Sequence, residues 1–547
     1  MNHSEKDRRA RRISHAVSCS IDEWLPDKIE TFGISAAAVG VVTVEENTWS
    51  KGFHAVDGGE PQSVDANTVF CVRSLSKAVT ALGVLVAVQK GLADLDKPII
   101  EYLPEFTIRT RYASHPERRI TLRHLLSNRA GFTHDEPPGN QPECQSSFET
   151  RVASIARTWL RFPVGLRYAY SNLHFDLVGH ILQKMTGDPF SVFMRENVLE
   201  PLGMRASTFD WEKAASSPNL ARGHDPTGEV EPIAISEIPS AGLYSTIADM
   251  ARFLRLHLRT DSADGRRFLQ EDLMDEYQAI QFPEPDQETG YCLGICRQLI
   301  GSTYSLSHSG GGHGYQSQMI IYPDLAFGIV FLTNKDGHGL TTGPLQKVID
   351  DVVRDETGEE PTPASPAAGG ERLPLDDRRL RAVLGRYWDD EHGDWTLDVI
   401  EGAPVLKTAS ESSRPVALYA CGDEIIGVCG SSGLMRFAAW DAGIPGMLLW
   451  SDRRVRNVVY RMRNGGPEDP SGPSKPEWAA YCGAFDILWK DMPCATERVE
   501  VRDGYLYFGD RRCTEHEPGL FFTCDGEAID LRSNPQTAAN LVLRRRG

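Results

Sequence analysis

The chain has 547 residues, of which 41% are hydrophobic and 24% are charged, and its formal net charge at pH 7 is −18. A chain of this length is too long for one hydrophobic core, so we expect about three domains. The acidic balance argues against nucleic-acid binding. No stretch approaches about 18 uninterrupted apolar residues, so we expect no membrane span.

The N-terminus is polar, with no apolar run behind it, so we expect no secretory leader and a cytoplasmic location. The 11 cysteines are spread thinly, without a C-x-x-C pair, and H-E-x-x-H is absent as well. This pattern fits a reducing compartment and predicts neither a disulfide scaffold nor a metal site. We therefore expect no metal and no other cofactor.

The N-terminal region predicts a helix followed by a hairpin. Residues 12–31 place apolar side chains at helical spacing, and Gly33 would end that helix. Residues 35–44 and 48–55 are strand-like runs separated by a polar turn.

An S-x-x-K motif, Ser74 to Lys77, opens an apolar run that ends at Gly91. The run predicts a core helix with Ser74 at its N-terminus and Lys77 one turn later on the same face. A lysine there can activate a serine nucleophile, particularly if partial burial lowers the pKa of the amine, and free N–H groups at a helix N-terminus suit a developing oxyanion. An ordinary capped core helix with a surface lysine is the alternative, because the motif alone is short.

Three further helices are predicted in the middle of the chain. Residues 120–131 indicate a short helix with Thr121 as its N-cap and a glycine stop, and helical periodicity resumes over residues 148–160. The polar, proline-rich segment between them, residues 133–148, is typical of a loop that overhangs a site. Residues 247–258 predict another helix.

Tyr170 and Asn172 directly precede a helix that ends at Gly187. The tyrosine could relay protons, and the asparagine could hold a substrate carbonyl or the lysine. Taken alone, the pair is better interpreted as an aromatic staple and an asparagine N-cap.

The segment 305–314 is a strand that contains His308 and ends in glycines, and the hairpin of residues 317–322 and 327–332 follows it. Glycines at a strand end let the backbone approach a ligand closely. His308 is a candidate base or hydrogen-bond donor, or only a turn residue.

The three signals stand in the order Ser74-x-x-Lys77, Tyr170-x-Asn172, His308-x-Gly310. Together they resemble the serine β-lactamase and penicillin-binding-protein family, and most closely class C β-lactamases and their relatives, including D-alanyl-D-alanine carboxypeptidases, D-aminopeptidases and esterases. In many of those relatives a histidine replaces the lysine of the third motif, as here. The G-x-S-x-G motif of α/β-hydrolases is absent.

This resemblance implies roles for the motif residues. Ser74 would attack the acyl carbon, while Lys77 and Tyr170 would share the general-base and general-acid work. Asn172 would bind the substrate amide and position Lys77.

The third motif would complete the substrate site. Backbone N–H groups of Ser74 and Gly311 would form the oxyanion hole, and Gly310 and Gly311 would line the substrate site. His308 would support Tyr170 and touch the substrate. The missing lysine argues against efficient β-lactam hydrolysis, because that cation normally helps to hold the carboxylate of the antibiotic.

The resemblance implies an α+β catalytic domain of β-lactamase/transpeptidase type over residues 1–357, with an antiparallel sheet flanked by helices and a helical subdomain. Residues 358–373 and 464–476 have linker compositions. Short alternating strands predict two antiparallel β-barrels, at 374–463 and 477–547.

Both C-terminal blocks open alike, with Leu384-Gly-Arg-Tyr387 and Cys482-Gly-Ala-Phe485, which suggests two related barrels. Relatives carry similar lipocalin-like tails. A loop from such a tail could limit substrate length, or the barrels could be packing or dimerisation modules.

The favoured function is a serine hydrolase that forms an acyl-enzyme with a small amide, ester or D-configured peptide. The alternatives are an acyltransferase or peptide cyclase that uses the same acyl-enzyme, or a weak β-lactamase or non-catalytic penicillin-binding protein. The expected partners are a small-molecule or short-peptide substrate, with a homo-oligomer possible.

Overall fold

The structure is a computed structural model of the whole chain. It describes all residues except the following: 1–2, 45–48, 55–63, 111–112, 135–146, 159, 161, 167, 226–227, 231–234, 260–266, 283–288, 301–302, 343, 359–372, 375, 378–379, 381–383, 390–392, 401, 409–410, 422–423, 430–432, 438–446, 453–455, 462–474, 490–491, 503–504, 510, 524–527, 533–535, 539–540 and 547. Both predicted linkers fall almost entirely outside the described residues.

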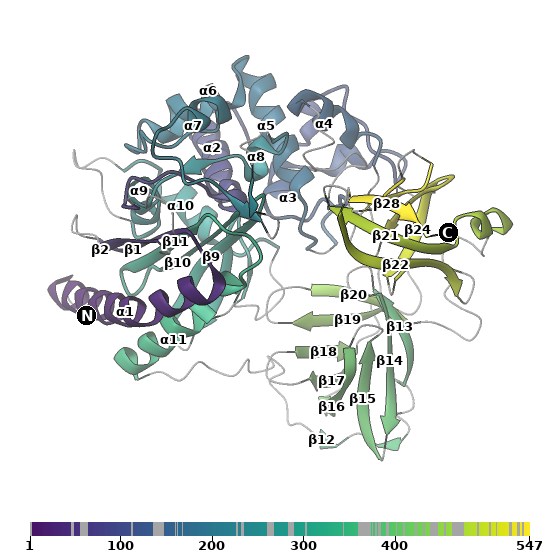
Figure 1. The fold of residues 1–547 in the computed structure, drawn as a ribbon. Coiled ribbons are helices and arrows are strands. Elements are labelled where there is room, and N and C mark those ends of the chain that lie inside the picture. The colour runs from purple at the N-terminus through teal and green to yellow at the C-terminus, as the bar shows by residue number, and fades with distance from the viewer. Residues whose placement is uncertain are drawn as a thin grey trace.

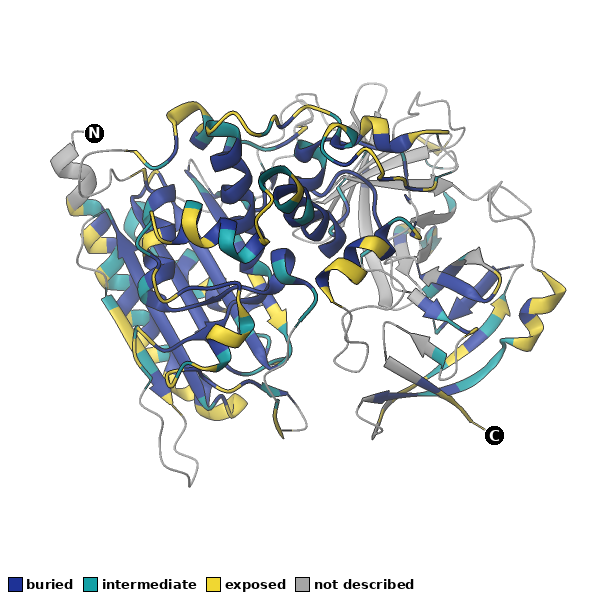
Figure 2. Cartoon of the chain, turned by 90° about the horizontal axis from the view of Figure 1, so that it is seen from above, coloured by how far each residue is buried: buried dark blue, intermediate teal, exposed yellow. Residues whose placement is uncertain are grey.

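A seven-stranded antiparallel sheet, in the order β2-β1-β11-β10-β9-β8-β7, forms the centre of the N-terminal part (Figure 1). Its strands are β1 (Ala36–Thr43), β2 (Trp49–His54), β7 (Gly290–Tyr291), β8 (Cys296–Ile300), β9 (Thr303–Gly312), β10 (Tyr315–Tyr322) and β11 (Phe327–Thr333). All residues of β1 and β11 are buried, which agrees with their nearly continuous apolar sequences. Figure 2 shows these strands as a buried layer with helices around it.

Alternate side chains of the strands enter two different cores. Ile320 and Phe331 join the apolar stripe of α1 (His3–Phe32) and the buried face of α11 (Pro344–Thr357). Met319 and Val330 join a larger core that includes α2 (Ser76–Gln89) and α9 (Ile247–His257). The period of two along each strand thus separates the two faces of the sheet.

The remaining helices lie on the α2 side of the sheet (Figure 1). They are α3 (Leu122–Leu126), α4 (Phe148–Ile155), α5 (Asn172–Thr186), α6 (Phe190–Met194), α7 (Trp211–Ala215), α8 (Ile238–Ala241) and α10 (Glu271–Gln278). The shorter turns are η1 (Arg73–Leu75), η2 (Ile99–Glu101), η3 (Pro116–Arg119), η5 (Arg195–Leu199), η6 (Leu340–Thr342) and η7 (Pro476–Ala480), and the shortest strands are β3 (Phe70–Cys71), β4 (His224–Asp225), β5 (Gly228–Glu229) and β6 (Tyr244–Ser245).

The helix α2 runs through the centre of this layer. Its residues from Ser76 to Ala87 are all buried, and it ends just before Gly91, whose φ is +71°. Burying one Val or Leu side chain contributes roughly 1.5–3 kcal/mol. Its position is therefore set by packing on all sides, and so is the position of the turn η1 that precedes it.

Both predicted C-terminal blocks contain antiparallel strands. The first is a nine-stranded sheet in which each strand from β13 to β20 pairs with the next and β13 also pairs with β20. The strands are β12 (Leu373–Pro374), β13 (Gly385–Asp389), β14 (Gly393–Ile400), β15 (Ala403–Thr408), β16 (Glu411–Cys421), β17 (Glu424–Cys429), β18 (Gly433–Phe437), β19 (Met447–Asp452) and β20 (Arg456–Arg461).

The second block forms a closed barrel of strands β21 to β28. These are β21 (Gly483–Trp489), β22 (Met492–Arg502), β23 (Tyr505–Phe508), β24 (Arg511–Glu517), β25 (Leu520–Thr523), β26 (Ala528–Asp530), β27 (Gln536–Ala538) and β28 (Leu541–Arg545). The two similar sequence segments lead into β13 and β21, respectively.

Several helix boundaries differ from the sequence-based expectation. Helix α1 begins at His3 instead of residue 12. Helix α3 ends at Leu126 and does not reach residue 131, because Asn128 adopts a left-handed φ of +56°. Helix α4 likewise stops at Ile155 instead of residue 160. The predicted N-cap Thr121 does accept a hydrogen bond from the His124 N–H.

No helix in the described part of the chain combines the length and the apolar character needed to cross a membrane.

Candidate active site

Ser74 lies in the turn η1, directly before α2, and Lys77 lies in the first turn of α2. The Lys77 Nζ donates a hydrogen bond to Ser74 Oγ over 3.1 Å. Lys77 is completely buried, whereas Ser74 is half-buried and lines a cavity. The two residues predicted from the S-x-x-K spacing are therefore in direct contact at the surface of a cleft.

Two further acceptors surround the Lys77 amine. Asn172 Oδ1 accepts a hydrogen bond over 2.7 Å and the Ser240 carbonyl over 2.9 Å. Asn172 is the first residue of α5, and the N-cap is Ser171, whose hydroxyl accepts from the Leu173 N–H. The capping alternative for Asn172 is therefore wrong, and its side chain is directed to the lysine instead.

A buried ion pair supports the second acceptor. Asp176 Oδ1 accepts a hydrogen bond from the Ser240 N–H over 3.2 Å, and its Oδ2 contacts Arg151 Nε over 2.7 Å. Both side chains of the ion pair are fully buried. This support was not predicted, although an acidic residue one turn after Asn172 in an otherwise apolar helix was an available signal.

Tyr170 and His308 complete the predicted set. The Tyr170 ring centroid lies 4.8 Å from Lys77 Nζ and 6.2 Å from the His308 ring centroid. His308 Nδ1 faces the Ser309 carbonyl over 2.7 Å, so Nδ1 carries the proton. Nε2 then accepts a hydrogen bond from the Tyr291 hydroxyl over 3.2 Å.

His308 does not replace the charge of a lysine. Burial, reinforced by the nearby charge of Lys77, lowers the pKa of His308 to about 3. The imidazole is therefore neutral at physiological pH and acts only as a hydrogen-bonding group.

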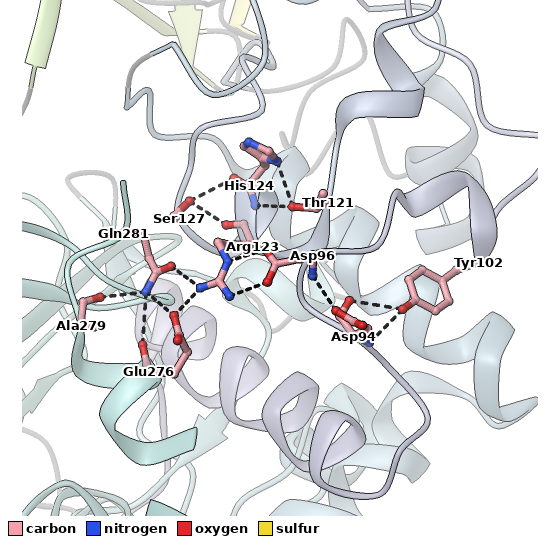
Figure 3. A network of polar contacts seen from close by, with 10 residues as sticks. All are labelled: Asp94, Asp96, Tyr102, Thr121, Arg123, His124, Ser127, Glu276, Ala279 and Gln281. Atoms are coloured by element: carbon pink, nitrogen blue, oxygen red, sulfur yellow. Dashed lines mark hydrogen bonds and ion pairs between the residues drawn. The ribbon is translucent and has the colours of Figure 1, made fainter. Parts of the chain in front are cut away.

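Tyr291 was missed by the sequence analysis because it belongs to no motif. Its backbone carbonyl accepts from the Gln281 N–H over 3.0 Å, and Gln281 Oε1 accepts from Arg123 Nη1 over 2.7 Å. Figure 3 shows Arg123 at the centre of this network, with Asp96 on one side and Glu276 on the other. Arg123 thus joins α3 to the end of α10 and so steadies the segment that carries Tyr291.

The glycine-containing end of β9 lies against the turn that carries Ser74. A Cβ atom on Gly310 would lie 2.5 Å from the Val72 carbonyl oxygen and 2.8 Å from the Ser74 nitrogen, so only glycine fits here. Ser317, opposite Gly310 on β10, donates from its Oγ to the same Val72 carbonyl over 2.7 Å. Gly311 is exposed beside this contact.

A cavity of about 820 Å³ opens over these groups. Ser74, Tyr170, His308, Gly310 and Gly311 all line it. Its lining also includes polar residues of α11, among them Gln346, Asp350 and Arg354. The described residues that line it all lie between positions 74 and 354, so no described residue of the C-terminal third reaches this cleft.

The antiparallel sheet, the helices around it and the contact between Ser74 and Lys77 define the β-lactamase/transpeptidase-like class of proteins. Comparison with known proteins agrees. The β-lactamase family model matches residues 21–349, which is more than half of the chain. The chain therefore belongs to the serine β-lactamase and penicillin-binding-protein family.

Two relatives are named as hydrolases or peptidases. An unguisins hydrolase from Aspergillus violaceofuscus is 24% identical over 496 residues, which cover 77% of this chain and 85% of that protein. The D-alanyl-D-alanine carboxypeptidase/endopeptidase AmpH of Escherichia coli is 25% identical over 357 residues, 60% of this chain and 87% of that protein. The solved structure of SurE with D-Leu has a TM-score of 0.56 and 22% identity, and the match covers 82% of this chain and 100% of SurE.

Proposed function

We propose that this protein is a serine hydrolase that forms an acyl-enzyme on Ser74. The observation that carries the proposal is the 3.1 Å contact between Lys77 Nζ and Ser74 Oγ at the wall of an accessible cleft. A serine hydroxyl is a weak nucleophile until a base removes its proton. Lys77 and Tyr170 are the groups beside Ser74 that can share this work.

In the proposed first step, Ser74 Oγ attacks the acyl carbon while its proton passes to the Lys77–Tyr170 pair. The N–H groups of Ser74 and Gly311 stabilise the negative oxygen that develops. The close approach of Gly310 to the Ser74 nitrogen supports this assignment, because it holds the strand end against the nucleophile. The pair then returns the proton to the leaving amine or alcohol.

In the second step, water attacks the acyl carbon. The same pair takes a proton from the water and returns one to Ser74 Oγ, which leaves as a free hydroxyl. The Asn172 amide has one role in holding Lys77 and a second in binding the amide of the substrate. His308, held neutral, positions Tyr291 and the wall of the cleft beside Tyr170.

We propose a small amide, ester or D-configured peptide as the substrate. The names of AmpH and of SurE with D-Leu support D-configured groups, and the fungal relative is named as a hydrolase of unguisins. A cleft of about 820 Å³ is large enough for a short peptide.

Acyl transfer to an amine is the second candidate. The cleft continues past Ser74 to α11, which leaves room for an acceptor beside the acyl group. Adding an amine during turnover would separate the two, because a transferase yields the amide product and a hydrolase yields the free acid.

We further propose that residues 374–463 and 477–547 form two related barrel domains behind a catalytic domain of residues 1–357. Their strand pairings support this division, and a role in packing or dimerisation fits the described cleft better than a role in limiting the substrate. Homo-oligomer formation stays a prediction, as does the cytoplasmic location.

The test is intact-protein mass spectrometry after exposure to a fluorophosphonate and, separately, to a penicillin. We expect one fluorophosphonate adduct on wild type and on Ser307→Ala, a control that removes another serine of the same cleft, and none on Ser74→Ala. A stable penicillin adduct would favour the penicillin-binding alternative, and rapid penicillin turnover a β-lactamase. No adduct on folded wild-type protein, or an adduct that persists in Ser74→Ala, would contradict the proposed nucleophile.

A further inference from the structure

Arg73, the residue directly before Ser74, occupies an unusual position. Its backbone φ is +49°, in the left-handed region that favours glycine. Its side chain is nonetheless large, charged and only 5% exposed. Both features are unfavourable on their own, so specific contacts must hold this arginine in place.

The guanidinium contacts two parts of the fold that are distant in the sequence. Nη2 forms an ion pair with Glu237 Oε2 over 3.2 Å, and the Glu237 side chain is 1% exposed. Nε donates a long hydrogen bond of 3.5 Å to the Gly311 carbonyl. The position of a Cβ atom on Gly312 lies 3.6 Å from both Nε and Nη2, so the guanidinium lies along the glycine segment at the end of β9.

Glu237 connects this contact to the lysine. It directly precedes α8, and its carbonyl accepts from the Ala241 N–H over 2.8 Å. The Ser240 carbonyl of the same short helix accepts from Lys77. One guanidinium therefore joins the nucleophile turn, the end of β9 and the helix that holds the lysine.

We propose that Arg73 is a positioning residue that keeps the Ser74 and Gly311 N–H groups at a fixed separation. The inference rests on the proposed acyl-enzyme function. Glycines 310–312 are the last residues of β9 and are paired with β10 on one side, and glycine has the most permissive backbone, so a contact from Arg73 adds a second restraint on the position of the Gly311 donor. A planar guanidinium can contact Glu237 and the Gly311 carbonyl at once, whereas the single ammonium of lysine is a compact point charge.

Two variants separate positioning from charge balance. Arg73→Lys keeps a cation opposite Glu237 but loses the planar guanidinium, whose separate N–H groups contact Glu237 and the Gly311 carbonyl at once. Arg73→Met combined with Glu237→Gln removes both charges and avoids an unpaired buried charge, which is the usual reason why such variants unfold. Arg118→Lys, at an exposed arginine, is the matched control.

The experiment measures the fluorophosphonate inactivation rate constant and the apparent inhibitor affinity of each folded variant, with thermal unfolding as the folding check. Complete loss of an oxyanion donor lowers kcat by roughly 10²–10³-fold, so we expect a loosened donor to lower the inactivation rate constant about tenfold or more. The affinity should change little, because the unreacted inhibitor does not yet carry the full oxyanion charge.

We expect the slow phenotype in both Arg73→Lys and the neutral double variant, even where their unfolding temperatures match wild type, and wild-type behaviour in Arg118→Lys. Labelling of both variants at the wild-type rate would overturn the positioning role of Arg73 but not the acyl-enzyme function. Wild-type stability and labelling rate in the double variant would also overturn it. The only role of Arg73 would then be to neutralise the buried charge of Glu237. No labelling of the wild type would overturn the acyl-enzyme function and this role with it.

Discussion

Asn172 and Asp176 lie one turn apart on α5 and hold Lys77 by two different routes. The Asn172 amide oxygen accepts directly from the lysine over 2.7 Å. Asp176 instead accepts from the Ser240 N–H over 3.2 Å, and the carbonyl of that serine accepts from Lys77 over 2.9 Å. One helical turn therefore sets the position of the amine, because residues four apart share a helix face.

The two residues should respond differently to substitution. Asn172→Ala removes a direct acceptor but no buried ion pair, so we expect fluorophosphonate labelling to slow by about 10²-fold or more, in the range found for positioned acid–base groups, with a smaller loss of stability. Mass spectrometry of labelling against time measures the rate. A wild-type rate in folded Asn172→Ala would show that the Ser240 carbonyl alone suffices.

Asp176→Asn should act mainly on folding. It leaves Arg151 as a buried guanidinium without its carboxylate, and breaking such pairs costs about 3–5 kcal/mol. Urea unfolding followed by tryptophan fluorescence measures the free energy of unfolding. Asp188→Asn, on the exposed surface, is the control and should change it by less than about 0.5 kcal/mol. Equal stability of both variants would contradict the structural role of the ion pair.

Gly310 should tolerate no side chain. An added methyl group would lie 2.5 Å from the Val72 oxygen and 2.8 Å from the Ser74 nitrogen, and both are backbone atoms that cannot move cheaply. We expect Gly310→Ala to reduce labelling of Ser74 by about 10²-fold or more, comparable with loss of an oxyanion donor.

Gly311→Ala is the comparison for that variant. The nearest atoms to its Cβ position are 3.8 Å away in the Gln316 side chain, and the N–H is retained, so we expect a far smaller effect on labelling. If the two variants lost labelling equally, the close approach at Gly310 would not be the reason for its glycine.

Acid should destabilise the protein through its buried histidines. Burial lowers the pKa values of His174, His257 and His308 to about 3, from an ordinary value of 6.5. Below pH 6.5 the unfolded chain binds protons that the folded chain excludes, so the free energy of unfolding falls as the pH drops from 6.5 towards 3 and is insensitive to these groups above that range. Each histidine contributes a slope of roughly 1 kcal/mol per pH unit.

The measurement is urea unfolding at several pH values between 7 and 4. His257→Asn, between Phe253 and Tyr277 and outside the residues that line the cleft, should reduce the slope by roughly one histidine's share. An unchanged slope in that variant would mean that His257 can take up a proton in the folded state.

We expect Arg297 to bind a carboxylate of the substrate. The neutral His308 carries no charge that could do so, whereas the guanidinium of Arg297 is always charged. Arg297 lines the cleft with its Cζ 3.8 Å from the Tyr304 ring centroid. Two other cations that line the described cleft, Lys347 and Arg354, both contact Asp351. A hydrogen bond to a charged group is worth about 1.5–3 kcal/mol, so Arg297→Gln should raise KM about tenfold or more for a peptide with a free carboxylate.

The control substrate is the same peptide with a C-terminal amide, for which Arg297→Gln should change KM little. The control variant is Lys347→Gln. The ammonium of Lys347 already has Asp351 as a partner, so its loss should raise KM less than the loss of Arg297. A similar rise in KM for the acid and the amide would contradict charge recognition by Arg297.

The sequence alone determined the parts of this protein that depend on local spacing. Ser74 and Lys77 are one turn apart, and the apolar run that follows them predicts a buried helix, as the structure shows. The same reasoning located β10, β11 and α5, because alternation and helical periodicity are set by neighbours along the chain. Helix ends were less predictable, because the left-handed Asn128 ends α3 before the expected glycine.

The tertiary structure decided which distant groups meet. Tyr291 contacts His308, Asp176 supports Ser240, and Arg73 pairs with Glu237, 164 positions further along the chain. No local pattern encodes such pairs, since a hydrogen bond or buried ion pair depends on how the backbones of remote segments pack to within a few ångströms. Spacing along one short segment therefore predicted the proposed nucleophile and its base, whereas only the packing of β9, α5 and α8 around them revealed what holds them in place.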